Sequence, residues 1–171
     1  GIGKTTLAEE VRGQAQQDKP FDKIVFVEVS KSPVIKDIQG GIADGFGLQL
    51  TEKFEHGRAE KLCDVLKREE KKILLILDNL WEGIELKKVG IPLGIPFGND
   101  CKGLKLLLTA RSQAVLTNEM NSQNNFHVDV LNDAEAWILF KSIAGTRVAE
   151  SHLKTTANKI VKKYGGFPLS P

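Results

Sequence analysis

The stretch Gly1-Ile2-Gly3-Lys4-Thr5-Thr6 opens the chain and matches the second half of a G-x-x-x-x-G-K-[ST] phosphate-binding loop. In such a loop, glycines let backbone N–H groups turn toward phosphate oxygens, and the following helix adds the positive end of its dipole. Lys4 is expected to reach the β- and γ-phosphates of a nucleotide, and the Thr5 hydroxyl to ligate Mg²⁺. The alternative is a glycine turn before a helix that carries an exposed lysine.

The loop is only half present in this sequence. Its leading glycine, and the strand that should launch it, would lie before residue 1. We therefore expect a fragment that begins inside its own binding site. Because the launching strand is normally central in an open α/β sheet, its two neighbours should lose a ladder partner. The bare chain should then fold poorly and bind nucleotide weakly.

Composition indicates a soluble globular chain of 171 residues, with 41% hydrophobic and 27% charged residues. The net charge of +2 is too small to indicate a nucleic-acid or membrane partner. The two cysteines, Cys63 and Cys101, form no disulfide framework or metal-binding spacing, so a reducing cytoplasmic setting is expected. The longest apolar run, Ile73 to Leu77, is far too short to span a bilayer.

Alternating helical and extended patterns follow the loop. Right-handed crossovers between such elements predict an α/β fold with an open, mostly parallel sheet flanked by helices. The expected helices are Thr5–Gln17, Val34–Phe46 and a segment around Ala59–Leu66, and the expected strands are Lys23–Val29, Ile73–Leu77, Leu104–Leu108 and a short Phe126–Val130. The segment Ile84–Asn99 is rich in Gly and Pro and is expected to be irregular.

The last part of the chain changes character. Two helices, Asn132–Ala144 and Ser151–Tyr164, follow each other without a strand between them, with Asn132 and Ser151 as N-caps and Gly165 as a stop. We expect a nucleotide-binding domain over residues 1–131 and the beginning of a helical subdomain over residues 132–171.

Asp78 follows the buried run Ile73–Leu77, at the strand end where open α/β sheets bind ligands. A phosphate-loop protein needs an aspartate there to hold Mg²⁺, although an aspartate can also simply cap a turn. The next residue is Asn79, whose amide cannot accept a proton at neutral pH. Hydrolysis should therefore be slow or depend on another residue, although an amide can still orient water.

Arg111 follows the strand Leu104–Leu108 and could contact the γ-phosphate and report its presence, with Thr109 adding a hydroxyl. The alternative is a surface arginine paired with a nearby acid. Three aromatic side chains could serve recognition, but core packing is the expected use: Trp81, Trp137 and Phe140. The three histidines share no ligand spacing and receive no site.

Six motifs in order resemble one family along essentially the whole chain: GIGKTT, FDKIVFVEVS, LLILDNLW, GLKLLLTARS, EAWILFKSIAG and GGFPLSP. They resemble the NB-ARC domain of plant NBS-LRR disease-resistance proteins, which carry C-terminal leucine-rich repeats, from the P-loop to the GLPL motif. Trp81 resembles the coiled-coil class of this family and not the class with a Toll/interleukin-receptor domain. Asn79, Phe167 and Ser170 depart from the usual aspartate, leucine and alanine.

The resemblance implies a switch that binds ADP at rest and ATP when activated, in defence signalling. It implies Mg²⁺ as a cofactor, other domains of the parent receptor and signalling proteins as partners, and possible self-association of the full-length protein. Asp78 would serve the metal together with Thr5, and Arg111 would sense the γ-phosphate. The residues expected to contact the nucleotide are Gly1, Ile2, Gly3, Lys4, Thr5, Thr6, Arg111 and, near the adenine, Pro168.

Two rival hypotheses remain. An ordinary P-loop ATPase of the motor or transporter type would carry a second catalytic carboxylate beside Asp78, and Asn79 argues against it. A non-functional fragment is the third. Whether the chain is an enzyme therefore stays open, with slow ATP hydrolysis as the most that Asn79 allows.

Overall fold

The computed structural model describes residues 3–68, 71–92 and 103–144, together with residues 155, 156, 159 and 161. The chain divides into two compact units. One unit spans Thr5–Asn125, and the other consists of Gly1–Lys4 and Phe126–Pro171.

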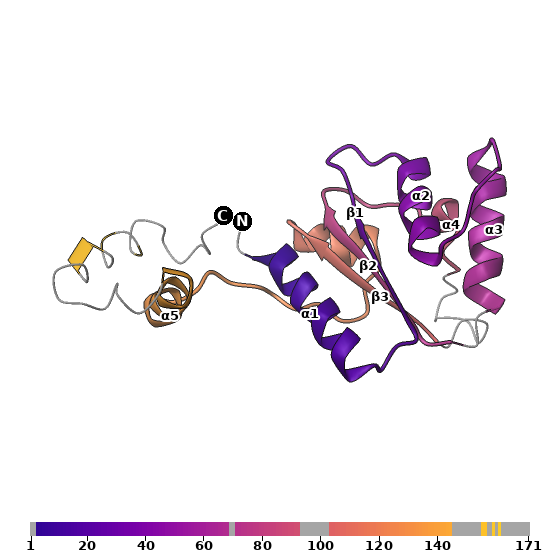
Figure 1. Cartoon of the computed structure of the whole chain (residues 1–171). Coiled ribbons are helices and arrows are strands. Elements are labelled where there is room, and N and C mark those ends of the chain that lie inside the picture. The colour runs from indigo at the N-terminus through magenta and orange to yellow at the C-terminus, as the bar shows by residue number, and fades with distance from the viewer. Residues whose placement is uncertain are drawn as a thin grey trace. The chain divides into compact units, whose positions relative to one another are not determined.

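Helices and strands alternate along the first unit, as Figure 1 shows. The order is α1 (Lys4–Asp18, whose first residue belongs to the other unit), β1 (Lys23–Glu28), α2 (Ile35–Phe46), α3 (Glu55–Arg68), β2 (Ile73–Leu80), α4 (Leu86–Val89), β3 (Leu104–Ala110) and the short π-helix η2 (Val115–Glu119). The segment expected to be irregular thus contains the short helix α4, and its residues 93–99 lie outside the described part.

The three strands pair in parallel in the order β1-β2-β3, so the expected open parallel α/β sheet is confirmed. Leu75 of the central strand pairs with Val25 on one side and Leu106 on the other. We expected two strands to lack a ladder partner where a central strand would lie between them. Among the three described strands this is not seen, because β2 pairs with β1 on one side and with β3 on the other.

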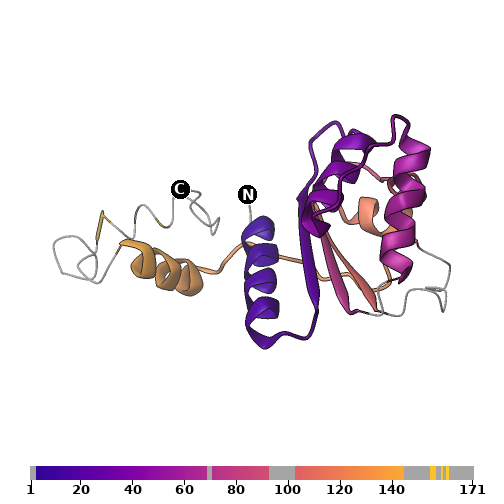
Figure 2. The ribbon, with the colours of Figure 1, turned by 45° about the vertical axis from the view of Figure 1, so that its right-hand side comes forward.

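The sheet separates two apolar clusters. In Figure 2, α1 lies on one side of the strands and α2 with α3 on the other. Side chains alternate between the two faces of a strand, and β2 follows this rule: Leu75 and Leu77 face the larger cluster, and Leu74 and Ile76 face α1. By the same alternation, Asp78 falls on the α1 face.

One buried amide side chain connects the helices that cover the larger cluster. Gln39 of α2 is 0% exposed, and its Nε2 donates to the backbone carbonyls of Glu55 and Lys88, each at 2.9 Å. Glu55 is the first residue of α3, and Lys88 lies within α4. One side chain therefore ties three helices together on the face opposite α1.

In the second unit, α5 (Asp133–Ala144) confirms the predicted helix and its cap. Asn132 Oδ1 accepts hydrogen bonds from the N–H groups of Ala134 and Glu135, and Glu135 Oε2 accepts one from the N–H of Asn132, each at 3.0 Å. This reciprocal pattern is a capping box. None of the described helices is long and apolar enough to cross a membrane.

Two further predictions concern the chain from residue 126 onward: a strand that the structure does not form, and a helix of which few residues are described. Residues 126–130 form no strand, so that prediction was wrong. β-branched and aromatic residues favour a strand only where an edge offers a partner. Of the predicted helix Ser151–Tyr164, only residues 155, 156, 159 and 161 are described, and all four are helical; both predicted ends, Ser151 and Gly165, lie outside the described residues.

Candidate functional site

Asp78 lies near the carboxyl end of β2 and is completely buried. Its two carboxylate oxygens have separate partners. The Thr5 hydroxyl on α1 donates to Oδ2 at 2.7 Å, and the Thr109 hydroxyl on β3 donates to Oδ1 at 2.5 Å. The structure thus brings together Thr5 and Asp78, the two residues predicted as metal ligands, from positions 73 residues apart.

The chemistry of this pair fits Mg²⁺. This ion takes oxygen ligands in an octahedral arrangement, and it usually combines one or two carboxylates with phosphate oxygens and water. Thr5 and Asp78 offer one hydroxyl and one carboxylate, converging within 2.7 Å of each other. Among the described residues, no group of three or more His, Cys, Asp or Glu could form a metal site made of protein alone.

A β-bulge follows Asp78 and decides where the next side chains go. The register shifts between Leu77 and Leu80, and Asn79 has a φ of 70°. Asparagine adopts this left-handed conformation more readily than most residues. The extra residue restores Leu80 to the larger core, where alternation alone would have turned it toward α1.

Asn79 is held at both its backbone and its side chain. Its N–H donates to the Thr109 hydroxyl at 2.9 Å, and its Nδ2 donates to the Val29 carbonyl at 3.4 Å, just beyond β1. The amide therefore joins the carboxyl ends of β1 and β2. A carboxylate at this position could not make the second bond, because it has no proton to donate.

Thr109 has a role that the sequence analysis missed. The predicted contact of its hydroxyl with phosphate stays a prediction. In the structure the Thr109 hydroxyl links Asp78 and Asn79, donating to Asp78 and accepting from the Asn79 N–H. Strand alternation was the available signal. Leu107 faces α1, so Thr109, two residues later, faces Asp78.

The start of α1 has two features that favour binding an anion. Gly3 has a φ of 85°, which glycine adopts without strain, and the helix begins at Lys4. The first N–H groups of a helix have no partner within it, and the first turn of α1 carries no acidic residue that would repel an anion. Thr6 lies in this turn and is exposed. The remaining predicted contacts, Gly1, Ile2 and Pro168, lie outside the described residues.

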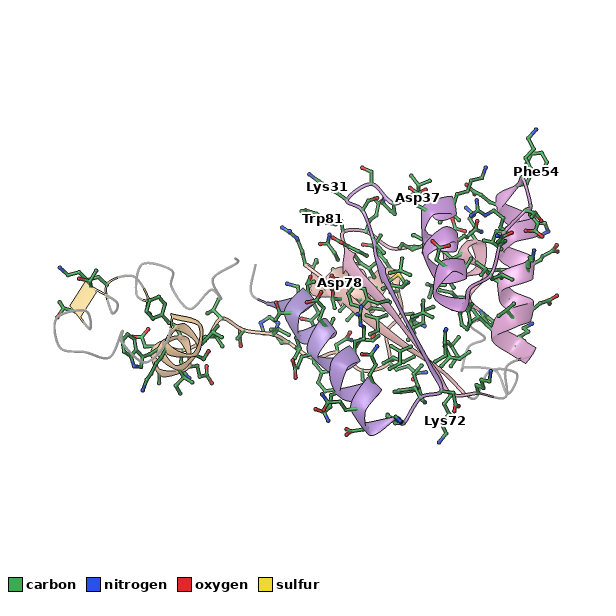
Figure 3. The ribbon with its side chains drawn as sticks, viewed as in Figure 1. Lys31, Asp37, Phe54, Lys72, Asp78 and Trp81 are labelled. Atoms are coloured by element: carbon green, nitrogen blue, oxygen red, sulfur yellow. The ribbon has the colours of Figure 1, made fainter. Side chains whose placement is uncertain are left out.

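A cluster of two cations and one indole ring lies at the same end of the sheet. The Arg111 guanidinium carbon lies 4.0 Å from the centroid of the Trp81 ring, and Lys31 Nζ lies 5.1 Å from it. Figure 3 shows Lys31, Trp81 and Asp78 near one end of the strands, with Lys72 at the other.

Trp81 is 36% exposed, so the expectation that it packs in the core was wrong. The bulge explains this, because it sends Leu80 into the core and leaves Trp81 beyond the strand end. Across the described residues, Arg111 forms no ion pair, so it does not pair with an acid there as the alternative required. In the other unit, Trp137 and Phe140 are half-buried and stack on each other with centroids 6.1 Å apart.

Comparison with known proteins gives one family and a consistent set of relatives. The family model of the NB-ARC domain matches residues 1–150. Three proteins of Arabidopsis thaliana, named Disease resistance protein RPS5, RFL1 and SUMM2, are 33%, 34% and 32% identical to the chain. Each alignment covers 99% of this chain and 19% of the relative, so the chain spans about a fifth of the length of these relatives.

Proposed function

The chain belongs to the NB-ARC family of nucleotide-binding domains, and from this premise we propose that it is the ATP/ADP-dependent switch of a plant immune receptor. The relatives named for disease resistance support the defence role of the parent protein. The observation that carries the nucleotide-dependent part is the contact of Thr5 with Asp78, because it joins the phosphate loop to the strand end where Mg²⁺ would be held.

Within this proposal the residues divide the work. Lys4 binds the β- and γ-phosphates as a point charge, and the N–H groups of the loop and of the first turn of α1 cradle them. Thr5 and Asp78 would hold Mg²⁺, which supplies neutralisation of phosphate charge when bound. Thr109 keeps the buried carboxylate of Asp78 in one orientation through its hydrogen bond.

Slow hydrolysis follows from Asn79. Its side chain cannot accept a proton from an attacking water, and its amide nitrogen is already engaged with the Val29 carbonyl. A nucleotide state that persists suits a switch better than a motor or transporter ATPase, which needs rapid turnover. The general P-loop ATPase remains the second candidate, and rapid hydrolysis by the chain would favour it.

The nucleotide state is read, in this proposal, by Arg111 at the end of β3, which would contact the γ-phosphate of ATP and not ADP. Pro168 would pack near the adenine, and Gly1 and Ile2 would complete the loop. At the level of the parent protein we propose a cytoplasmic receptor, with its other domains and signalling proteins as partners and with self-association on activation.

Calorimetric titration tests the nucleotide-dependent part. The chain is titrated with ADP and with a non-hydrolysable ATP analogue in the presence of Mg²⁺. Lys4→Ala should abolish or strongly weaken binding of both nucleotides, whereas Lys36→Ala, on the exposed surface of α2, should leave both unchanged. Equal affinities for the wild type and Lys4→Ala would refute the proposed site.

A further inference from the structure

Trp81 and Arg111 come from two loops that are fixed to each other. The backbone N–H of Arg111 donates to the Leu80 carbonyl at 3.4 Å, which places the backbone of Arg111 beside the end of β2. The loop after Trp81 is attached to η2 and the residue after it: the Gly83 N–H donates to Glu119 Oε2 at 2.5 Å, and the Ile84 N–H donates to Met120 Sδ at 3.2 Å.

The approach of these two segments is close. A Cβ on Gly83 would lie 2.5 Å from the Cβ of Glu119, so only glycine fits without a shift. Since η2 begins four residues after Arg111, the same short stretch that carries the guanidinium also holds the loop that carries the indole. The position of the Arg111 guanidinium over the Trp81 ring, 4.0 Å from its centroid, is thus supported by hydrogen bonds of both backbone segments.

We propose that Trp81 is the positioning residue for Arg111, holding its guanidinium by stacking so that Arg111 can distinguish a nucleoside triphosphate from a diphosphate. This inference rests on the proposed function, in which Arg111 meets the γ-phosphate. It adds the reason why an aromatic residue stands at the end of β2 and is exposed there.

Stacking is compatible with binding a phosphate. A guanidinium that lies on an aromatic face keeps its N–H groups at the edge, where they can donate to phosphate oxygens. An arginine held in this way loses less conformational freedom when it binds than one that moves without restraint. Among the described residues Arg111 has no carboxylate partner, so the indole is the contact that restrains its charged end.

Lys31 is the competing explanation for the exposed indole. Its Nζ lies 5.1 Å from the Trp81 centroid, farther than the 4.0 Å of Arg111. A longer contact between exposed groups is weaker. Trp81 should therefore act on nucleotide discrimination mainly through Arg111, and Lys31 should contribute little.

The test measures the ratio of the Kd for ADP to the Kd for a non-hydrolysable ATP analogue, each with Mg²⁺, by calorimetry of the 171-residue chain. Trp81→Ala should weaken binding of the ATP analogue by about 3- to 30-fold, the range expected for a lost cation–π contact. ADP affinity should change by less than about twofold, as for a surface substitution, which also shows that the variant is folded. Trp81→Phe should restore part of the loss.

A double-mutant cycle assigns the effect. The double variant Trp81→Ala/Arg111→Ala should bind the ATP analogue no more weakly than Arg111→Ala alone. Lys31→Ala should change the affinity for the ATP analogue by less than about twofold. In a Trp137→Phe background, where Trp81 is the remaining tryptophan, Arg111→Ala should shift the fluorescence spectrum of Trp81, since it uncovers the ring.

The outcomes separate this inference from the proposed function. If the wild type binds neither nucleotide, even at the weak affinity expected of this chain, both fail. The role of Trp81 is overturned, and the proposed function stands, if Arg111→Ala removes the preference for the triphosphate while Trp81→Ala leaves it intact. The same conclusion follows if the losses of affinity for the ATP analogue in Trp81→Ala and Arg111→Ala add fully in the double variant. Reproduction of the Trp81→Ala effect by Lys31→Ala would also overturn it.

Discussion

Replacing Thr109 with valine removes one hydroxyl from the candidate site and nearly preserves the shape of the side chain. The hydroxyl donates to Oδ1 of Asp78 at 2.5 Å and accepts from the Asn79 N–H at 2.9 Å. Asp78 is 0% exposed, so water cannot take over the lost contact without entering the site. The substitution leaves two polar groups short of a partner, and one of them is a buried carboxylate.

The magnitude follows from these two bonds. A hydrogen bond to a charged group contributes about 1.5–3 kcal/mol, and one between neutral groups about 1 kcal/mol. The valine variant should therefore lose about 2–4 kcal/mol of unfolding free energy, which is a large part of a typical total of roughly 5–15 kcal/mol. At a urea m-value of about 2 kcal/mol/M, the midpoint should fall by about 1–2 M.

Urea unfolding followed by circular dichroism measures this loss. Thr109→Ser keeps the hydroxyl and should retain most of the stability. Thr117→Val is the matched control, because its hydroxyl makes an exposed bond to the Gln113 carbonyl at 3.1 Å, and its effect should stay within about 0.5 kcal/mol. A Thr109→Val midpoint equal to that of the wild type, or a serine variant as unstable as the valine variant, would refute the reasoning.

Four further substitutions test other parts of the structure. Asn79→Asp should raise ATP hydrolysis by about 10- to 100-fold, because a carboxylate can accept a proton from water; a phosphate-release assay with no increase would contradict this. Hydrogen bonding to its own backbone N–H, and then to Lys61, lowers the pKa of Glu52 below its ordinary value of 4.5. Ionised Glu52 thus stabilises the fold above pH 4.5. The urea midpoint of the wild type should exceed that of Glu52→Gln at neutral pH, and this difference should shrink as the pH falls below 4.5. Gly90→Ala should cost about 1–3 kcal/mol, since φ is 97° and a Cβ would lie 2.4 Å from a backbone oxygen of α3. Gly13→Ala, with nothing within 4 Å, should instead stabilise α1 by up to about 1 kcal/mol in the same urea assay.

The parallel sheet was predictable because its strands are rich in apolar residues and helices lie between them in the sequence. The run Ile73–Leu77 is buried on both faces, as such runs are in parallel sheets. Asp78 was predictable for the same reason, since a charged residue at the end of a buried run points to the strand end. Its contact with Thr5 then requires only that α1 covers that face of β2.

The details beyond Asp78 were not predictable, because they depend on one residue with a positive φ. A left-handed Asn79 shifts the register, returns Leu80 to the core and places Trp81 outside it. Strict alternation predicts the opposite arrangement. Likewise, the extended pattern at residues 126–130 could not reveal whether a sheet edge would be available to it.

In the proposed function, Thr5 and Asp78 together hold the metal of a bound nucleotide. The most direct test compares the affinity of the chain for the ATP analogue with Mg²⁺ and with EDTA, for the wild type and for Asp78→Asn. The wild type should bind more tightly with Mg²⁺, and Asp78→Asn should lose this gain while keeping its affinity in EDTA. An undiminished Mg²⁺-dependent gain in Asp78→Asn would contradict the claim.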